Sequence, residues 1–281
     1  MSDLLSAGIY RYRKSAMFWI MLAITLILGM VVGMIADSSY DVEITYFAGL
    51  FLVIAIQSSL MVGIEFSNGV VRNKLVAGHG KGMVFLSELV LSLIAATLLF
   101  VVFYGAFAVF NMQWLDDIDA RDMAVVVVGL WLVHLSLAAV CTAICFFIPY
   151  YSAIAAVLNI VLVIAMAFVG NDLRSKFDEP EYIYMYTHDE NGNMIPVYDD
   201  NRNPKYIPRD SAEYFLLHTA YYIMPNGQLI DYCSAVSKKQ WVGTIKEKYM
   251  DDLKTAPLYS LLTIGICTAA GLICFRKKNL K

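Results

Sequence analysis

Long apolar runs alternate with short polar segments along most of the chain, and this pattern predicts its fold. A helix needs about 20 mostly apolar residues to cross a bilayer. Six runs approach or exceed that length: Ala16–Ala36, Ile44–Ile64, Met83–Phe110, Met123–Ile148, Ala153–Gly170 and Leu258–Phe275. We therefore expect an all-α polytopic membrane protein with six transmembrane helices.

The composition agrees with that pattern. Hydrophobic residues make up 59% of the chain and charged residues only 16%, whereas a soluble domain carries roughly a quarter charged residues. Residues 1–14 are polar and cationic, and the apolar run that follows them is too long for the core of a cleavable signal peptide.

The distribution of Lys and Arg predicts the orientation, because short cytoplasmic loops are enriched in these residues. The N-terminus, the segment after the second run and the C-terminus together contain ten of them: Arg11, Arg13, Lys14, Arg72, Lys74, Lys81, Arg276, Lys277, Lys278 and Lys281. The opposite short loops, 37–43 and 111–122, contain only Arg121. Both termini are therefore expected inside, with a tight inner turn at 149–152 and one long outer segment over 171–257.

The outer segment has local patterns of its own. Tyrosine at positions 182, 184 and 186 precedes Asn191-Gly192, which predicts a β-hairpin. Ser211 can cap a short helix that Pro225-Asn226-Gly227 would end. Such a helix cannot span a bilayer, so we expect it at the outer interface or against the bundle, followed by a charged helical segment over 238–257. The expected units are thus the N-terminal segment (1–14), the first five spans (15–172), the extracellular loop domain (173–256) and the last span with its basic tail (257–281).

Candidate chemistry is sparse. The stretch "GHGKG" (78–82) lacks the Walker pattern, because Leu75 and Gly82 stand where glycine and Ser or Thr are needed. We find no catalytic set, expect no cofactor on this chain, and interpret the cysteines as packing residues without a metal. Inside the spans, the polar residues that could line a pathway are Gln57, Ser58, Ser59, His134 and Asn159. They could equally hold neighbouring helices together, and a neutral, hydrogen-bonded His134 is as compatible with the pattern as a functional one.

The polar segment at about 66–82 is the most informative feature. Its sequence can form a short helix from about Ser67 to Ala77, ended by Gly78. Its side chains are apolar at Val70, Val71, Leu75 and Val76 and cationic at Arg72 and Lys74. A short helix with apolar knobs can dock in a groove of a soluble partner. The alternative is a solvated loop that only obeys the charge rule.

This segment resembles the cytoplasmic loop of ABC-2-type permeases, the membrane subunits of ATP-binding-cassette exporters. The matching residues are Glu65, Gly69, Arg72, Asn73, Lys74, Leu75 and Gly78. The departures are Val70 in place of a threonine and Gly80-Lys81 in place of a Ser-Arg pair. The six-span layout, with both ends inside and short outer helices before the last span, is similar as well. The resemblance also implies that the cationic residues 1–14 form a cytoplasmic interface helix.

The resemblance implies a transport function. The 66–82 segment would be a coupling helix seated on a separate ATPase subunit, with Lys81 beside it, and ATP and Mg would bind that partner. Two such permeases, identical or homologous, would pair with each other and with two ATPase subunits. The assembly would lie in a bacterial cell membrane, in contact with its lipids, and would bind no nucleic acid. A peptide or lipid-like amphipathic substrate fits the tyrosine-rich outer segment. A non-transporting immunity or sensor protein, which captures an antimicrobial peptide on that segment, remains an alternative.

Overall fold

The computed structural model describes residues 1–38, 44–110, 120–148, 152–177, 179–188, 194–236 and 244–278. Its long helices are α2 (Ala16–Ser38), α3 (Ile44–Ser67), α5 (Lys81–Phe110), α7 (Ala120–Phe147), α8 (Ser152–Phe177) and α11 (Thr244–Lys277). These six helices each contain a stretch long and apolar enough to cross a membrane. The prediction of six helices that are long and apolar enough to span a membrane is therefore confirmed.

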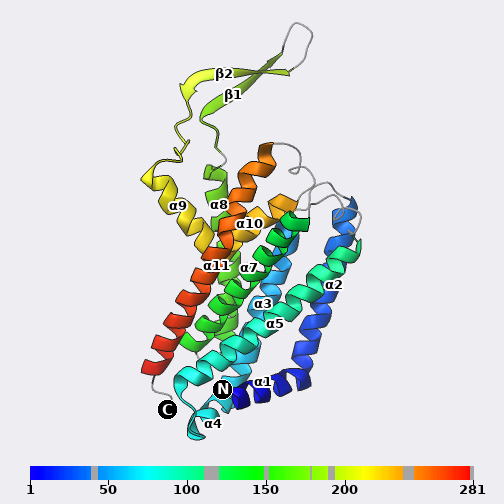
Figure 1. Cartoon of the computed structure of the whole chain (residues 1–281), viewed down its shortest axis with the longest axis vertical. Helices are drawn as coiled ribbons and strands as arrows, with labels where there is room; N and C mark the ends of the chain where they lie inside the picture. The colour runs from blue at the N-terminus through cyan, green and yellow to red at the C-terminus, as the bar shows by residue number, and fades with distance from the viewer. Residues whose placement is uncertain are drawn as a thin grey trace.

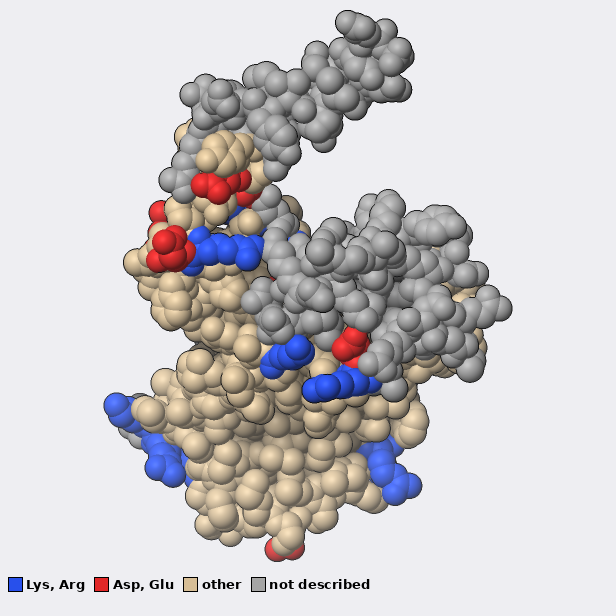
Figure 2. All heavy atoms as spheres, turned by 45° about the horizontal axis from the view of Figure 1, so that its top comes forward, with Lys and Arg blue, Asp and Glu red and all other residues tan. Residues whose placement is uncertain are grey.

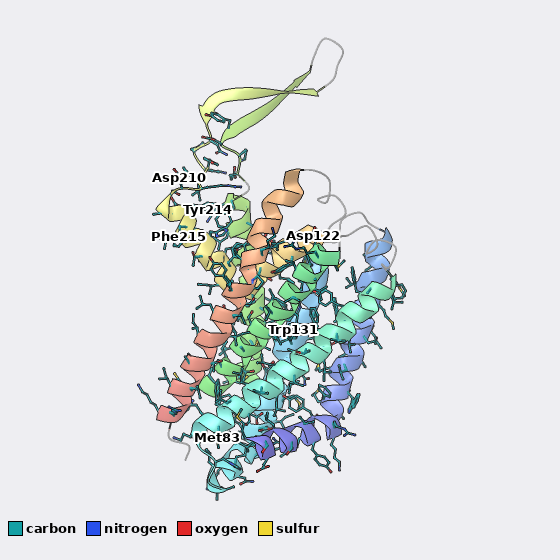
Figure 3. The ribbon with its side chains drawn as sticks, viewed as in Figure 1. Met83, Asp122, Trp131, Asp210, Tyr214 and Phe215 are labelled. Atoms are coloured by element: carbon teal, nitrogen blue, oxygen red, sulfur yellow. The ribbon has the colours of Figure 1, made fainter. Side chains whose placement is uncertain are left out.

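The long helices form one bundle around α7. Helix α7 contacts α3, α5, α8, α10 (Pro225–Val236) and α11. Figure 3 places Met83 of α5 near the end of the bundle where α1 lies and Asp122 of α7 at the opposite end, so these two helices run in opposite directions. Both chain termini lie at the end that carries α1 (Ser2–Lys14) and α4 (Val70–Val76), as Figure 1 shows.

The outer surface of the bundle is apolar between two charged ends. Large hydrophobic side chains are exposed along α2, α8 and α11, among them Ile27, Phe168 and Leu262. In the view of Figure 2, Lys and Arg side chains border a broad surface without charged side chains along its upper edge and at its left and right flanks. Side chains of this kind are stable in contact with acyl chains rather than with water.

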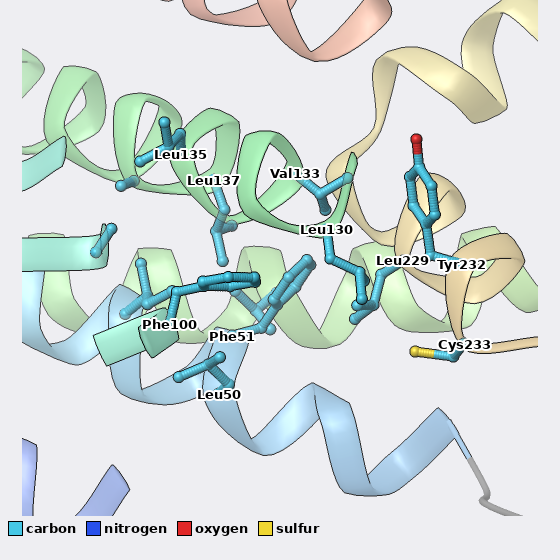
Figure 4. Packing of buried hydrophobic residues seen from close by; sticks show 14 of the residues in the cluster. Leu50, Phe51, Phe100, Leu130, Val133, Leu135, Leu137, Leu229, Tyr232 and Cys233 are labelled. Atoms are coloured by element: carbon cyan, nitrogen blue, oxygen red, sulfur yellow. The ribbon is translucent and has the colours of Figure 1, made fainter. Parts of the chain in front are cut away.

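The interior is packed by side chains from α3, α5, α7 and α10. Phe51, Phe100 and Leu137 meet there, and Leu229 and Tyr232 extend the same cluster from α10 (Figure 4). Helix α10 approaches α7 closely because Gly129 has no side chain, and a Cβ at this position would collide with the Tyr232 ring.

The predicted helix after Ser211 is present as α9 (Ala212–Ile223). The Ser211 hydroxyl accepts a hydrogen bond from the Tyr214 backbone N–H at 3.1 Å, which is the usual N-cap arrangement. The Pro225-Asn226-Gly227 triplet does end α9, but it also begins α10, which the sequence analysis did not anticipate. Proline suits the first turn of a helix, where its missing N–H costs nothing.

Two antiparallel strands, β1 (Tyr182–His188) and β2 (Met194–Arg202), lie beyond the far end of the bundle (Figure 1). Tyr184 is opposite Tyr198, and the register is irregular between Tyr182 and Tyr184. The expected turn at 191–192 lies outside the described residues, so the hairpin and its extracellular placement stay predictions. Residues 39–43, 111–119, 149–151 and 237–243 of the other predicted loops are outside the description too.

Helix α11 differs from the predicted last span, because it starts at Thr244 and continues through Pro257. An internal proline has no N–H, so the carbonyl four residues earlier, on Leu253, lacks its helical partner. The Tyr232 hydroxyl of α10 donates to that carbonyl at 3.0 Å. The buried backbone group is therefore satisfied from a neighbouring helix, as a low-dielectric environment requires.

Candidate functional site

The short helix α4 forms a sharp turn between α3 and α5. Gly69 and Gly78, at its two ends, have φ angles of 68° and 92°, in the region that glycine adopts without strain. The N–H of His79 bonds the carbonyl of Lys74 at 3.1 Å and that of Gly78 bonds Leu75 at 3.0 Å, a Schellman arrangement. The helix covers Val70–Val76 and is shorter than the predicted 67–77, because α3 continues to Ser67.

A group of four ionisable side chains, which we call the ion-paired base, lies beneath α4. The Lys74 ammonium donates to the Glu65 carboxylate at 2.7 Å and also to the Glu88 carboxylate. The Arg11 guanidinium pairs with Glu65 at 2.5 Å. These residues come from α1, α3, α4 and α5, so two basic and two acidic side chains join four helices.

Three members of the ion-paired base are buried, which makes the loss of one of them costly. The exposed fractions of Lys74, Glu65 and Glu88 are 8%, 6% and 1%. Removing one member of such a buried set leaves an uncompensated charge, which costs about 3–5 kcal/mol. Tyr12 lies beside it, and its pKa is raised by burial first and then by the carboxylates of Glu88 and Glu65. Its phenol therefore stays neutral and adds no charge.

The two faces of α4 have different environments. Val71 is buried and Leu75 is half-buried against an apolar cluster that includes Phe85, Phe146 and Phe275. Together with Lys74, these side chains attach α4 to its own bundle. The sequence predicts that Leu75 and Lys74 are available to a partner, whereas the structure directs both toward the chain itself.

The opposite face is what a partner could reach. Arg72, Asn73, Val76 and Ala77 are exposed, and Val76 has 80% of its surface accessible. We call these four residues the α4 outer face. The predicted coupling set is therefore divided: Glu65, Lys74 and Leu75 are internal, Gly69 and Gly78 shape the ends, and Arg72 and Asn73 are on the outer face.

Lys81 has a separate role at the start of α5. Its ammonium donates to the backbone carbonyls of Arg276 at 3.2 Å and Lys278 at 2.5 Å. Lys278 in turn donates to the carbonyl of Phe147 at 2.6 Å. Lysines at helix C-termini satisfy unpaired carbonyls and oppose the negative end of the helix dipole. Lys81 thus joins α5 to the end of α11.

The five pathway candidates, Gln57, Ser58, Ser59, His134 and Asn159, are all buried inside this single chain. The Asn159 amide donates to the Ser59 hydroxyl at 2.7 Å and to the Cys141 carbonyl at 3.2 Å. These bonds connect α8 with α3 and α7. For Ser59 and Asn159 the geometry favours the helix-joining interpretation.

His134 and Gln57 are less fully satisfied. Nδ1 of His134 lies 2.6 Å from the Leu130 carbonyl oxygen, so we assign its proton to Nδ1. The rings of Phe51 and Phe100 stand edge-on around it at 5.1 and 5.4 Å. Its Nε2, and both polar atoms of the Gln57 amide, have no hydrogen-bond partner within the described part of the chain. A pathway role for these two residues stays a prediction.

Another buried carboxylate, that of Asp231, lies at the other end of the bundle, and the sequence did not reveal it. It accepts from Arg174 of α8 at 3.1 Å, from Tyr221 at 3.1 Å and from Tyr222 at 2.7 Å, the last two on α9. Burial first and then Asp231 raise the pKa of the Tyr221 phenol, which keeps it a donor. The sequence does contain a signal for this site, because Asp231 is the only acid in the mostly apolar stretch "QLIDYC". A carboxylate buried in such a stretch needs a partner.

Within the residues that the structure describes, no group of three or more His, Cys, Asp or Glu side chains could hold a metal ion. The five cysteines are free thiols. Comparison of the chain with protein-family models, with curated proteins and with solved structures finds no match.

Proposed function

We propose that this chain is the transmembrane permease of an ATP-binding-cassette exporter, and that α4 is the element on which a separate ATPase subunit acts. The observation that carries the proposal is the two-faced environment of α4. Its outer face is exposed, with Val76 at 80%, while its inner face is ion-paired to two long helices. A solvated loop whose cations served only the positive-inside rule would not need this internal attachment.

The ion-paired base gives the proposal a mechanism. An ATPase that closes around ATP would push on Arg72 and Val76. Because the Lys74 ammonium bonds Glu65 of α3 and Glu88 of α5, a displacement of α4 is passed to both helices. The left-handed glycines Gly69 and Gly78 allow α4 to turn as a unit. Arg11 extends the same displacement to α1.

The experiment is site-specific photo-crosslinking in the native membrane. A photoreactive amino acid at Val76 should crosslink to a protein that carries Walker motifs, identified by mass spectrometry. The matched control is the same amino acid at Leu216, which is 67% exposed on α9 at the opposite end. An ATPase recovered from both positions, or from neither, would contradict the proposal.

We assign a peptide or lipid-like amphipathic molecule as the exported substrate, moved by two permease chains and two ATPases. Support comes from the apolar residues of α9, where Phe215 and Leu216 are 68% and 67% exposed. Figure 3 shows Phe215 beside Tyr214 at the end of the bundle opposite Met83. An amphipathic molecule that leaves the bundle at this end would contact such side chains.

The same exposed side chains favour a second candidate, a membrane immunity or sensor protein that captures an antimicrobial peptide without transporting it. The two functions differ at α4, because capture does not require an ATPase. Val76→Glu should abolish export but leave peptide capture intact. If cells that carry Val76→Glu remain protected against the antimicrobial peptide while no substrate is transported, the second candidate would be favoured.

A further inference from the structure

The corner at which α1 meets α2 exposes two cations and two aromatic rings. Arg13 and Lys14 are exposed at the end of α1, and Tyr10 and Trp19 are 57% and 56% exposed. Leu4, Gly8 and Tyr12, on the other side of α1, are buried. Helix α1 is thus fixed along one side, and its remaining surface belongs to neither the core nor the α4 outer face.

Two contacts hold the corner in a defined shape. The Trp19 indole N–H donates to the Arg13 carbonyl at 2.8 Å, across the extended Ser15 that separates the helices. The Lys14 ammonium lies 4.6 Å from the centroid of the Tyr10 ring. Within the described residues, neither Arg13 nor Lys14 pairs with a carboxylate, in contrast to Arg11, which pairs with Glu65.

The corner lies at the edge of the apolar span. That span begins at Ala16, so Arg13 and Lys14 are within one helical turn of the hydrocarbon and Trp19 is one turn inside it. Tyr and Trp occupy this depth in membrane proteins, with their rings among the headgroups. The neighbouring Ile9 and Ile20 are 43% and 52% exposed, which continues the lipid-facing surface of α2 up to the two cations.

We propose that this corner is a binding site for the phosphate-bearing headgroup of an anionic phospholipid. Arg13 and Lys14 would bind the phosphate, Tyr10 and Trp19 would flank the glycerol, and Ile20 would contact the acyl chains. Each cation near the surface strengthens binding to an anionic lipid by about fivefold, so the pair would give a preference of about 25-fold over a zwitterionic lipid. The proposal does not rest on the transport function.

The test uses the purified full-length protein in vesicles of phosphatidylcholine that contain brominated lipid, which quenches tryptophan fluorescence on contact. Brominated phosphatidylglycerol should quench more strongly than brominated phosphatidylcholine at equal mole fraction. The excess quenching should disappear in Trp19→Phe, because Trp19 reports on this corner. It should also weaken as salt is raised, since the cations are exposed.

The charge variants locate the site. Arg13→Gln with Lys14→Gln should lower the preference for phosphatidylglycerol by about 25-fold, and each single change by about fivefold. Arg13→Lys with Lys14→Arg should retain it. The matched control, Arg276→Gln with Lys277→Gln, removes two exposed cations at the same end of the molecule and should leave the preference unchanged.

Three results would overturn the proposal. The first is equal quenching by the two lipids in the unaltered protein, and the second is an undiminished preference for phosphatidylglycerol in the Arg13/Lys14 variant. The third is the same loss of preference in the Arg276/Lys277 control, which would mean that the preference comes from general surface charge. Displacement by glycerol phosphate in solution would instead indicate a site for free phosphates, so we expect no displacement. If the double glutamine variant fails to fold, the single variants and Trp19→Phe decide the question.

Discussion

Lys74 is the residue at which the resemblance and the structure differ most. In the sequence it is one of several cations in a polar loop, and nothing nearby distinguishes it from Arg72. In the structure it is 8% exposed and bonded to two carboxylates. The sequence could not reveal this, because Glu88 is fourteen residues away, inside a run that had been interpreted as a span.

We expect Lys74→Met to destabilise the folded protein by about 3–5 kcal/mol, because Glu65 and Glu88 would then face each other while buried. The free energy of unfolding would be measured in mixed micelles with a denaturing detergent. Arg72→Met, on the exposed face of the same helix, should change it by less than about 0.5 kcal/mol. Glu88→Gln should restore part of the loss in the Lys74→Met background, and failure to do so would argue against a shared charge network.

Tyr232 and Pro257 form a second residue-scale pair. Tyr232→Phe removes the donor to the Leu253 carbonyl, and a buried unsatisfied carbonyl costs about 1–3 kcal/mol. Pro257→Ala restores the backbone N–H that this carbonyl lacks in α11. Tyr232→Phe should therefore be less costly in the Pro257→Ala background. Unfolding of the four proteins of this double-mutant cycle would measure the coupling, and strictly additive effects would exclude it.

Among the elements, the long helices follow from hydrophobic runs, whereas α10 does not. A span is predictable because lipid imposes both its length and its composition. Helix α10 is short and buried over residues 225–233. It therefore has neither the length of a membrane span nor the exposed polar face of an amphipathic helix. Its starting proline was interpreted only as the end of α9, although proline also favours a first turn.

The element-scale prediction concerns α4. Val76→Glu places a carboxylate on its outer face, where we propose that an ATPase cleft closes over an apolar side chain. An unpaired charge in such an interface should lower recovery of the complex by roughly tenfold or more. Leu216→Glu, at another exposed apolar site on α9, should leave recovery unchanged. Co-purification of the tagged chain with the proposed ATPase would measure the effect of both changes.

Leu75→Glu distinguishes docking from folding. Because Leu75 packs against the apolar cluster beneath α4, its replacement should destabilise the folded chain itself. A stable Leu75→Glu protein that has lost only its partner would contradict the inward orientation of Leu75. The sequence alone favoured Leu75 as a docking residue, since its motif position and apolar side chain say nothing about which face of α4 it occupies.

At the scale of the whole molecule, the two termini and α4 lie at one end and α9 with the two strands at the other (Figure 1). The positive-inside rule predicts that the first end is cytoplasmic. Single cysteines at positions 76 and 215, in a protein whose exposed Cys274 is replaced by Ser, should react with a membrane-impermeant maleimide from opposite sides. Labelling of both from one side of intact cells would contradict the fold, and inverted labelling would contradict the orientation.

The far end of the molecule also shows where the strands can be removed. Asn203 is 7% exposed, and its amide donates to Glu179 at 2.9 Å and to the Pro180 carbonyl at 3.0 Å, while its N–H bonds Glu181 at 2.8 Å. These bonds close the base of the two strands without involving them. A Gly-Ser link in place of residues 182–202 should therefore leave insertion and ATPase binding intact.

A longer deletion provides the control for this last prediction. Replacing 181–210 removes Asn203 and the Pro208 carbonyl that receives the Ser211 hydroxyl at 2.6 Å, so α9 should lose its ordered start and the protein its stability. If the strands contact the substrate, the shorter deletion should change substrate-stimulated ATP turnover in the reconstituted complex while basal turnover is kept. Loss of assembly in the shorter deletion would show that the strands support the fold. Unchanged stimulation with unchanged substrate range would show that neither strand takes part in recognition.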